Sequence, residues 1–247
     1  MILYNRILDK LKKLNVDFEK KVLVALSGGA DSVFLAESIS EIFEKNRVVC
    51  CHINHNLRQN ASNDENFVSE YCKNRNLELV IKKIDVRKYS EDNKISIETA
   101  GRDLRYMEFE KVIEEKKIEY LFTAHTADDN IETFFMRLLR GTGLQGLECI
   151  KEITFKKTHI LIRPMLDIFK NDILDFLKMK NINFAEDESN YSEEYFRNYI
   201  RLNILNKLKK DFGAQILSNI PSIIKIIKKN NEFVENNVTK DFKNIVK

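Results

Sequence analysis

The chain has 247 residues, of which 43% are hydrophobic, enough for one large domain or one domain with a small addition. It has no run of about 18 apolar residues, which argues against a membrane span. Its lysine-bearing N-terminus lacks the apolar core of a signal peptide, so we expect a cytoplasmic location. The net charge is +3, with a basic excess in residues 151–247 that suits nucleic-acid contact and equally suits solvated helices.

In chain order, residues 2–14 have the three- and four-residue apolar spacing of an amphipathic helix. Apolar runs typical of buried strands then alternate with helical patterns. The predicted strands cover residues 22–26, 48–53, 77–84 and 120–124, and the helices cover residues 31–45, 60–76, 96–116 and 127–140. This alternation predicts an α/β fold with a doubly wound parallel sheet. Ligands bind such sheets at the carboxyl ends of the strands, where the polar motifs described below begin.

Beyond residue 150 the pattern changes. We expect short strands at 153–155 and 160–162, helices at 169–180 and 193–210, and a helical stretch from Phe212 to Lys247 with one break at Pro221. We therefore predict a main domain at 1–190 and an appended helical segment at 191–247.

The four cysteines form no C-x-x-C pair, and a disulfide framework is not expected in a chain of this size and location. Cys50 and Cys51 adjoin His52, which raises the alternative of a metal site. Consecutive strand residues point to opposite faces, however, so both thiols could not easily reach one ion. We expect packing cysteines.

The first strand leads into Ser27-Gly28-Gly29-Ala30-Asp31-Ser32 and then a helix. Glycines let the backbone approach a ligand closely, and the amides of a first helical turn attract anions. The loop lacks the lysine of a Walker loop and the spacing of a dinucleotide-binding motif. It resembles the pyrophosphate loop of N-type ATP pyrophosphatases, the PP-loop superfamily. That function would require Mg²⁺ between Asp31 and the phosphates. The alternative is a tight turn with Asp31 or Ser32 as helix cap.

Three further motifs carry polar groups. His52 and His55 lie where the chain leaves the second strand and could contact a nucleotide, bind a metal or simply form a hydrogen-bonded loop. Arg102 and Arg105 share a helix face and could clamp phosphate oxygens, or form a salt-bridged surface.

The third motif is acidic. Asp129 and Glu132 lie three residues apart, and Asp128 and Glu132 four apart, so either pair shares a helix face. Such a pair could seat a cationic amine, bind Mg²⁺ or take a proton from an attacking amine. The alternative is that these acids only complement the helix dipole.

Together and in this order, the motifs resemble those of the tRNA(Ile)-lysidine synthase family. The resemblance spans nearly all of residues 20–205. It comprises residues 27–32, 52–58, 101–106, 125–133, 140–147, 162–166, 186–190 and 197–201.

The resemblance implies an adenine nucleotide α hydrolase-like fold and a ligase that uses ATP and Mg²⁺. ATP adenylates the wobble cytidine of tRNA(Ile) with a CAU anticodon and releases pyrophosphate; free L-lysine then attacks carbon 2 of the base, giving lysidine and AMP. The partners are tRNA(Ile) and lysine, with no membrane, and a homodimer is allowed.

The roles implied for single residues follow the motifs. The catalytic residues would be Asp31, Arg102, Arg105 and Asp129, with Asp31 binding Mg²⁺. ATP would contact Ser27, Gly28, Gly29, Ala30, Asp31, Ser32, His52 and Arg102. Lysine would contact Asp129 and Glu132, and tRNA would contact Arg140, Arg197 and Arg201.

Two other functions compete with this one. A PP-loop tRNA thiolation enzyme shares the loop, but such enzymes use C-x-x-C pairs or a placed catalytic cysteine. A non-catalytic ATP-binding module of the same fold would not need the paired carboxylates and arginines. Lysidine synthases usually continue into further C-terminal tRNA-binding domains, so we expect this chain to be a short member or a catalytic fragment.

Overall fold

The computed structural model describes residues 2–55, 61–185 and 196–245. The chain forms two compact units. Unit 1 contains the described residues of Met1–His125, Glu152–Met165 and Lys170–Glu186. Unit 2 contains those of Thr126–Lys151, Leu166–Phe169 and Asp187–Lys247. No described helix is long and apolar enough to cross a membrane.

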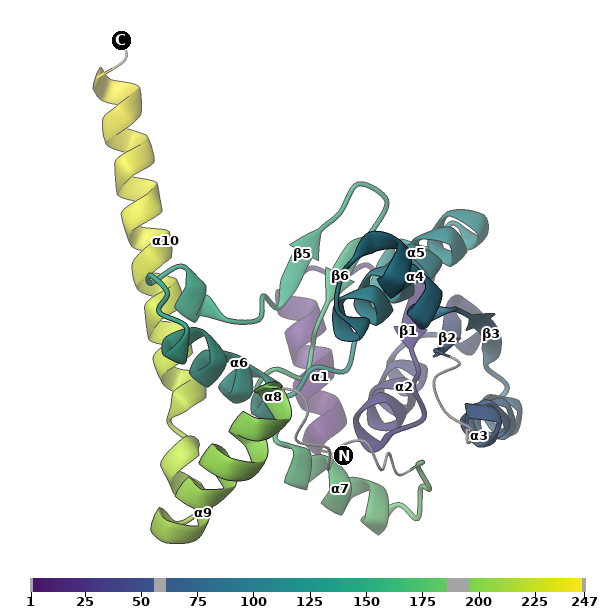
Figure 1. The fold of residues 1–247 in the computed structure, drawn as a ribbon. Helices are drawn as coiled ribbons and strands as arrows, with labels where there is room; N and C mark the ends of the chain where they lie inside the picture. The colour runs from purple at the N-terminus through teal and green to yellow at the C-terminus, as the bar shows by residue number, and fades with distance from the viewer. Residues whose placement is uncertain (1, 56–60, 186–195, 246–247) are drawn as a thin grey trace. The chain divides into compact units, whose positions relative to one another are not determined.

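Unit 1 is built on a six-stranded sheet with the strand order β3-β2-β1-β4-β6-β5 (Figure 1). The strands are β1 (Val22–Ala25), β2 (Val48–Asn54), β3 (Glu78–Lys83), β4 (Tyr120–Phe122), β5 (Ile153–Phe155) and β6 (Ile160–Ile162). All neighbouring pairs are parallel except β5 and β6, which form an antiparallel edge. Every residue of β2 is buried, including His52 and Asn54 at its carboxyl end, as expected for a strand inside a parallel sheet. The predicted α/β class is confirmed.

Helices cover both faces of this sheet (Figure 1). They are α1 (Ile2–Lys13), α2 (Ala30–Ile42), α3 (Ala61–Arg75), α4 (Val86–Asn93), α5 (Ile97–Lys116) and α7 (Lys170–Met179), with a 3₁₀ turn at Lys45–Arg47. On one face, Phe109 and Val112 of α5 pack in a core with Leu23 of β1 and Leu121 of β4. Elsewhere, α1, α2 and α7 meet through aromatic rings, since Phe176 lies 5.2 Å from Phe34 and 4.8 Å from Tyr4 between centroids.

Unit 2 is helical in its described part. It contains α6 (Ala127–Leu139), α8 (Phe196–Tyr199), a π-helix (Ile200–Leu205), α9 (Asn206–Phe212) and α10 (Ile220–Ile245), with 3₁₀ turns at Gly146–Glu148 and Ala214–Leu217. Its core joins Ile131 of α6 to Ile200, Leu205 and Leu217. A second apolar cluster packs Phe134 and Cys149 against Ile224 of α10.

Several details differ from the sequence-based expectations. The predicted parallel sheet has an antiparallel edge strand, and α4 was not expected. Pro221 does not break a helix; it is the second residue of α10, where its missing amide hydrogen costs nothing. The predicted boundary at residue 190 lies outside the described residues and stays a prediction. All four cysteines are buried thiols.

Candidate functional site

The loop after β1 is organised from within by the hydroxyl of Ser32. Ser32 Oγ accepts hydrogen bonds from the amides of Ser27 (3.2 Å) and Gly28 (3.1 Å), and donates one to the carbonyl of Gly29 (2.9 Å). Helix α2 begins directly after Gly29, which is its N-cap and makes no side-chain cap bond. Capping by Asp31 or Ser32, the simpler alternative, is therefore wrong.

Gly28 is the residue of this loop that must lack a side chain. Its φ of +99° lies in the region that favours glycine, and a Cβ there would approach Phe67 and Val68 to 3.4 Å. The amides of the first turn of α2 follow, and they have no carbonyl partners within their own helix. Asp31 lies in that turn and is partly exposed. The loop thus offers backbone donors, a helix dipole and one carboxylate to an anion and its counterion.

The two histidines at the end of β2, His52 within the strand and His55 just after it, contact neighbouring backbone. His52 is buried, and its Nδ1 lies 2.9 Å from the carbonyl oxygen of Leu26, at the start of the loop. The ring of His55 packs on Gly101, where an added Cβ would lie 3.4 Å from Nδ1. Its Nε2 is 3.5 Å from Nη2 of Arg105. Both histidines therefore take part in contacts within unit 1, as the hydrogen-bonded alternative predicts.

Arg102 and Arg105 are exposed on the first half of α5. The guanidinium carbon of Arg102 lies 5.6 Å from the ring centroid of Tyr106. The same tyrosine lies near Arg163, whose Nη1 donates to Thr154 Oγ1 (3.2 Å). Arg163 is buried directly after β6, and burial, together with the charge of Arg102, lowers its pKa.

Tyr106 and Arg163 were not among the site residues predicted from the sequence. The position of Arg163 in the chain could have identified it. It immediately follows β6, and the carboxyl end of β6 lies on the same side of the sheet as the carboxyl end of β1, where the pyrophosphate-like loop begins. Because β2, β1, β4 and β6 are parallel neighbours, their carboxyl ends meet at that edge. The first half of α5 contacts His55 after β2 and Arg163 after β6. Unit 1 therefore gathers the loop and three guanidiniums at one sheet edge.

In unit 2, Asp129 is bound to the start of its own helix. The amide and hydroxyl of Thr126, the N-cap of α6, donate to Asp129 Oδ2 at 2.8 Å and 3.0 Å. The amide of Asp129 in turn donates to the Thr126 hydroxyl, which completes a capping box. Asp129 therefore has a structural function whatever else it binds.

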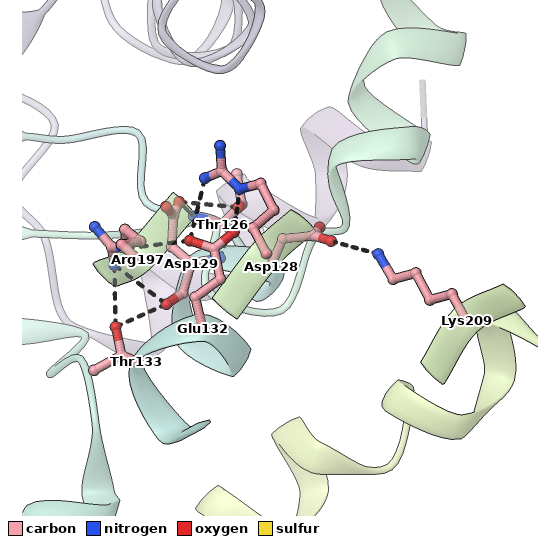
Figure 2. Close-up of polar contacts among 8 residues, drawn as sticks. Thr126, Asp128, Asp129, Glu132, Thr133, Arg197 and Lys209 are labelled. Atoms are coloured by element: carbon pink, nitrogen blue, oxygen red, sulfur yellow. Dashed lines mark hydrogen bonds and ion pairs between the residues drawn. The ribbon is translucent and has the colours of Figure 1, made fainter. Parts of the chain in front are cut away.

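Glu132 lies in the same network and is the most buried carboxylate of α6 (Figure 2). Arg201 donates from Nε to Oε1 (2.5 Å) and from Nη2 to Oε2 (3.1 Å). Arg197 Nε lies 3.1 Å from Oε2, and its Nη2 donates to Thr133 Oγ1 (3.1 Å). Burial raises the pKa of Glu132, and the hydrogen bond from Arg201 opposes that rise.

The remaining candidates lie apart from these bonds or outside the described residues. Arg140, the C-cap of α6, is exposed, and its guanidinium carbon lies 5.0 Å from the Phe196 ring centroid. Arg58 and residues 186–190, which contribute to the family resemblance, fall outside the described residues. Unit 1 thus holds the candidate ATP residues, and unit 2 holds the candidate lysine and tRNA residues.

Among curated proteins, the chain is 39% identical over 244 residues to a tRNA(Ile)-lysidine synthase of Clostridium perfringens, covering 94% of this chain and 51% of that protein. It is also 39% identical to the tRNA(Ile)-lysidine synthase of Pseudothermotoga lettingae, covering 76% and 42%. A bifunctional protein TilS/HprT of Listeria monocytogenes is 40% identical, covering 79% and 31%. The chain spans about half the length, or less, of these relatives.

Among solved structures, the U34-tRNA thiolase NcsA from Methanococcus maripaludis has a TM-score of 0.74 at 19% identity, covering 91% of this chain and 77% of that chain. At this identity the likeness shows the fold alone. The model of the PP-loop domain family matches residues 3–208. The matched residues include the loop at Ser27–Ser32 and the arginines of α5. They also include Glu132 with its partners Arg197 and Arg201 in unit 2. The chain belongs to the PP-loop domain family.

Proposed function

We propose that this chain carries the activity of a tRNA(Ile)-lysidine synthase. The oxygen on carbon 2 of the wobble cytidine attacks the α-phosphorus of ATP, and pyrophosphate leaves. The side-chain amine of free lysine then attacks carbon 2, loses a proton, and AMP leaves with that oxygen. The observation that carries the proposal is the 39% identity to curated lysidine synthases across 94% of the chain, with the phosphate loop intact.

The phosphate end of ATP is assigned to the loop at Ser27–Ser32. Membership in the PP-loop family implies ATP use. The glycines leave room for the β- and γ-phosphates, and the amides at the start of α2 donate to them. Asp31 is the ligand proposed for Mg²⁺, which when bound would offset the repulsion between this carboxylate and the phosphates. His52 supports the loop through Leu26.

The positive charge that stabilises the α-phosphate during its transfer is assigned to Arg102 and Arg105. Both are exposed, at the sheet edge that carries the phosphate loop. Guanidinium groups placed where negative charge develops in the transition state lower the barrier of phosphoryl chemistry. Tyr106 lies against the Arg102 guanidinium, and the charge of Arg163 is near enough to Arg102 to affect its electrostatics.

The lysine and tRNA contacts are assigned to unit 2. Of the two carboxylates predicted for lysine, Asp129 is partly exposed and Glu132 is buried, so Asp129 is the better candidate for receiving the amine. Arg140, Arg197 and Arg201 are proposed to contact tRNA phosphates, which arginine binds well. A cytoplasmic location and a homodimer stay predictions.

The test is incubation of the protein with ATP, labelled lysine and a tRNA(Ile) transcript with a CAU anticodon. We expect label in the tRNA and ATP-dependent release of AMP and pyrophosphate. The matched control is a transcript with uridine in place of the wobble cytidine, which should take no label. Modification that requires a sulfur donor instead of lysine would favour the thiolation alternative. ATP binding without tRNA-dependent pyrophosphate release would favour the non-catalytic module.

A further inference from the structure

Glu132 is enclosed by the two arginines that contact it. Its side chain is 2% exposed, and both carboxylate oxygens already face guanidinium nitrogens. A lysine amine could reach this carboxylate only by displacing a guanidinium. Removing a partner from a buried ion pair leaves an uncompensated charge, which is strongly unfavourable. Glu132 is therefore poorly suited to direct substrate binding.

The arginines, in contrast, reach the surface. The side chains of Arg197 and Arg201 are 32% and 29% exposed. Arg201 donates to Glu132 from both Nε and Nη2. Nε of Arg197 lies 3.1 Å from Glu132 as an ion pair without a hydrogen bond, and its Nη2 donates to Thr133. Among the described residues, neither Nη1 has a hydrogen-bond partner. One carboxylate thus fixes two planar donors while leaving one terminal nitrogen of each available.

Three carboxylates and three basic side chains cancel in net charge here, so what favours an anion is the two guanidinium nitrogens that remain available. Glu132 faces two guanidiniums, and the neighbouring Asp128 is paired with Lys209 at 3.4 Å (Figure 2). Asp129 complements the amides at the start of α6, where negative charge is stabilised by the helix dipole. Two fixed guanidiniums with available donors match a phosphodiester oxygen pair. Arg201 also lies in a π-helix, a form often found at functional sites.

We propose that Glu132 is a positioning residue for tRNA binding and not a lysine ligand. It holds Arg197 and Arg201 in the orientation in which they bind backbone phosphates of the tRNA. This inference rests on the proposed function, because it takes tRNA as the substrate. Glu132, which the family resemblance implied as a lysine contact, thus becomes a residue that orients the arginines. Arg197 and Arg201 remain the proposed tRNA contacts.

The first test compares Glu132→Gln with the wild-type chain. Glutamine keeps the size of the side chain but loses the charge that orders both guanidiniums. We expect tRNA(Ile) to bind about tenfold more weakly, as for the loss of one charge-assisted hydrogen bond. The KM for lysine, measured at saturating tRNA, should stay within about twofold of the wild-type value, which is the variation expected of a substitution that does not affect lysine binding. Glu235→Gln is the control, since it removes one charge from unit 2 at a residue bonded to Gln145. It should change neither quantity.

A second variant decides the matter if Glu132→Gln does not fold. The double change Arg197→Lys and Arg201→Lys keeps Glu132 neutralised but removes the bidentate geometry. It should also weaken tRNA binding and leave the lysine KM unchanged. A raised lysine KM with unchanged tRNA affinity in the folded variants would overturn the inference, as would no change in either. Failure of the wild-type chain to make lysidine would instead refute the proposed function, so the two failures are distinct.

Discussion

Ser32 shows how a single hydroxyl can organise a ligand loop. Its oxygen is the acceptor for two consecutive loop amides, and the residue is buried. Without it, those amides would have to find water or rotate away from their present directions. The hydroxyl therefore shapes the phosphate site even if it never touches a phosphate.

We predict that Ser32→Ala weakens ATP binding by about fivefold or more. Two loop amides lose their acceptor, of which the Gly28 amide is buried, and this costs about 1–3 kcal/mol if the loop keeps its form. Calorimetric titration with ATP and Mg²⁺ measures the effect. Ser40→Ala is the matched control: it lies on the same helix, and among the described residues its hydroxyl bonds the carbonyl of Glu37 and no other group. Equal ATP affinity in the wild-type and Ser32→Ala chains would contradict this role of Ser32.

Two glycines after α6 differ sharply in the space around them. A Cβ on Gly146 would lie 1.8 Å from Thr142 Oγ1 and 2.9 Å from Thr142 Cβ, so rotation of the threonine cannot relieve the clash. A Cβ on Gly143 would have nothing within 4 Å. We predict that Gly146→Ala lowers the free energy of unfolding by about 1–3 kcal/mol, as overpacking does, and Gly143→Ala by much less. Urea denaturation measures both; equal losses would contradict the account.

At the scale of elements, the hairpin of β5 and β6 carries a buried histidine. His159 directly precedes β6, and its Nδ1 lies 3.0 Å from Thr158 Oγ1. Burial lowers its pKa, and the nearby charge of Glu110 opposes the shift. The folded chain thus binds this proton less tightly than the unfolded chain does.

This shift predicts a pH dependence of stability. The contribution of His159 is complete above the unfolded pKa of about 6.5 and is lost as the pH falls toward the lower folded value. We expect urea midpoints of the wild-type chain to decrease from pH 7.5 to 5.5 more steeply than those of His159→Gln. Parallel slopes in the two proteins would show that His159 does not cause the dependence.

Elements with strong local patterns could be predicted from the sequence. The run Val22–Leu26 followed by two glycines identified β1 and its loop, and the helices α1, α5 and α6 lie within a residue or two of their predicted bounds. Helix α4 was missed because it has few apolar residues. It is defined by its ends, where Asp85 accepts from the amide of Lys88 and Lys94 is left-handed.

The partners in unit 2 could not be predicted in the same way. The spacing of Asp129 and Glu132 correctly placed both on one helix, but spacing does not reveal what each side chain meets. Asp129 bonds its own N-cap, a local contact that competes with any ligand. Glu132 meets Arg201 across 69 positions of sequence, a contact that only the tertiary packing of α6 and the π-helix creates.

At the scale of the whole molecule, the two units divide the proposed reaction. Unit 1 contains the groups suited to ATP, namely the amide-lined loop, the guanidiniums of α5 and the guanidinium of Arg163 after β6. Unit 2 contains the acidic and basic groups suited to lysine and tRNA. The chemistry needs both sets, so changes in unit 2 should spare the binding of ATP.

We therefore predict that Asp129→Asn leaves the ATP dissociation constant unchanged and raises the KM for lysine about tenfold, as expected for loss of one charged hydrogen bond. Asparagine keeps a carbonyl oxygen for the capping box, so α6 should stay folded, which circular dichroism checks. Asp172→Asn, in the first turn of α7, is the control for charge removal at a helix start. Loss of ATP binding with an unchanged lysine KM would contradict the assignment of Asp129.

The most direct measurement is mass spectrometry of the wobble nucleoside after the tRNA has been incubated with the chain. With ATP, Mg²⁺ and lysine all present, the account predicts that cytidine is converted to lysidine; with lysine omitted, pyrophosphate is released and an adenylated tRNA remains. An unmodified cytidine under the complete conditions, with ATP bound and the tRNA intact, would contradict the central claim.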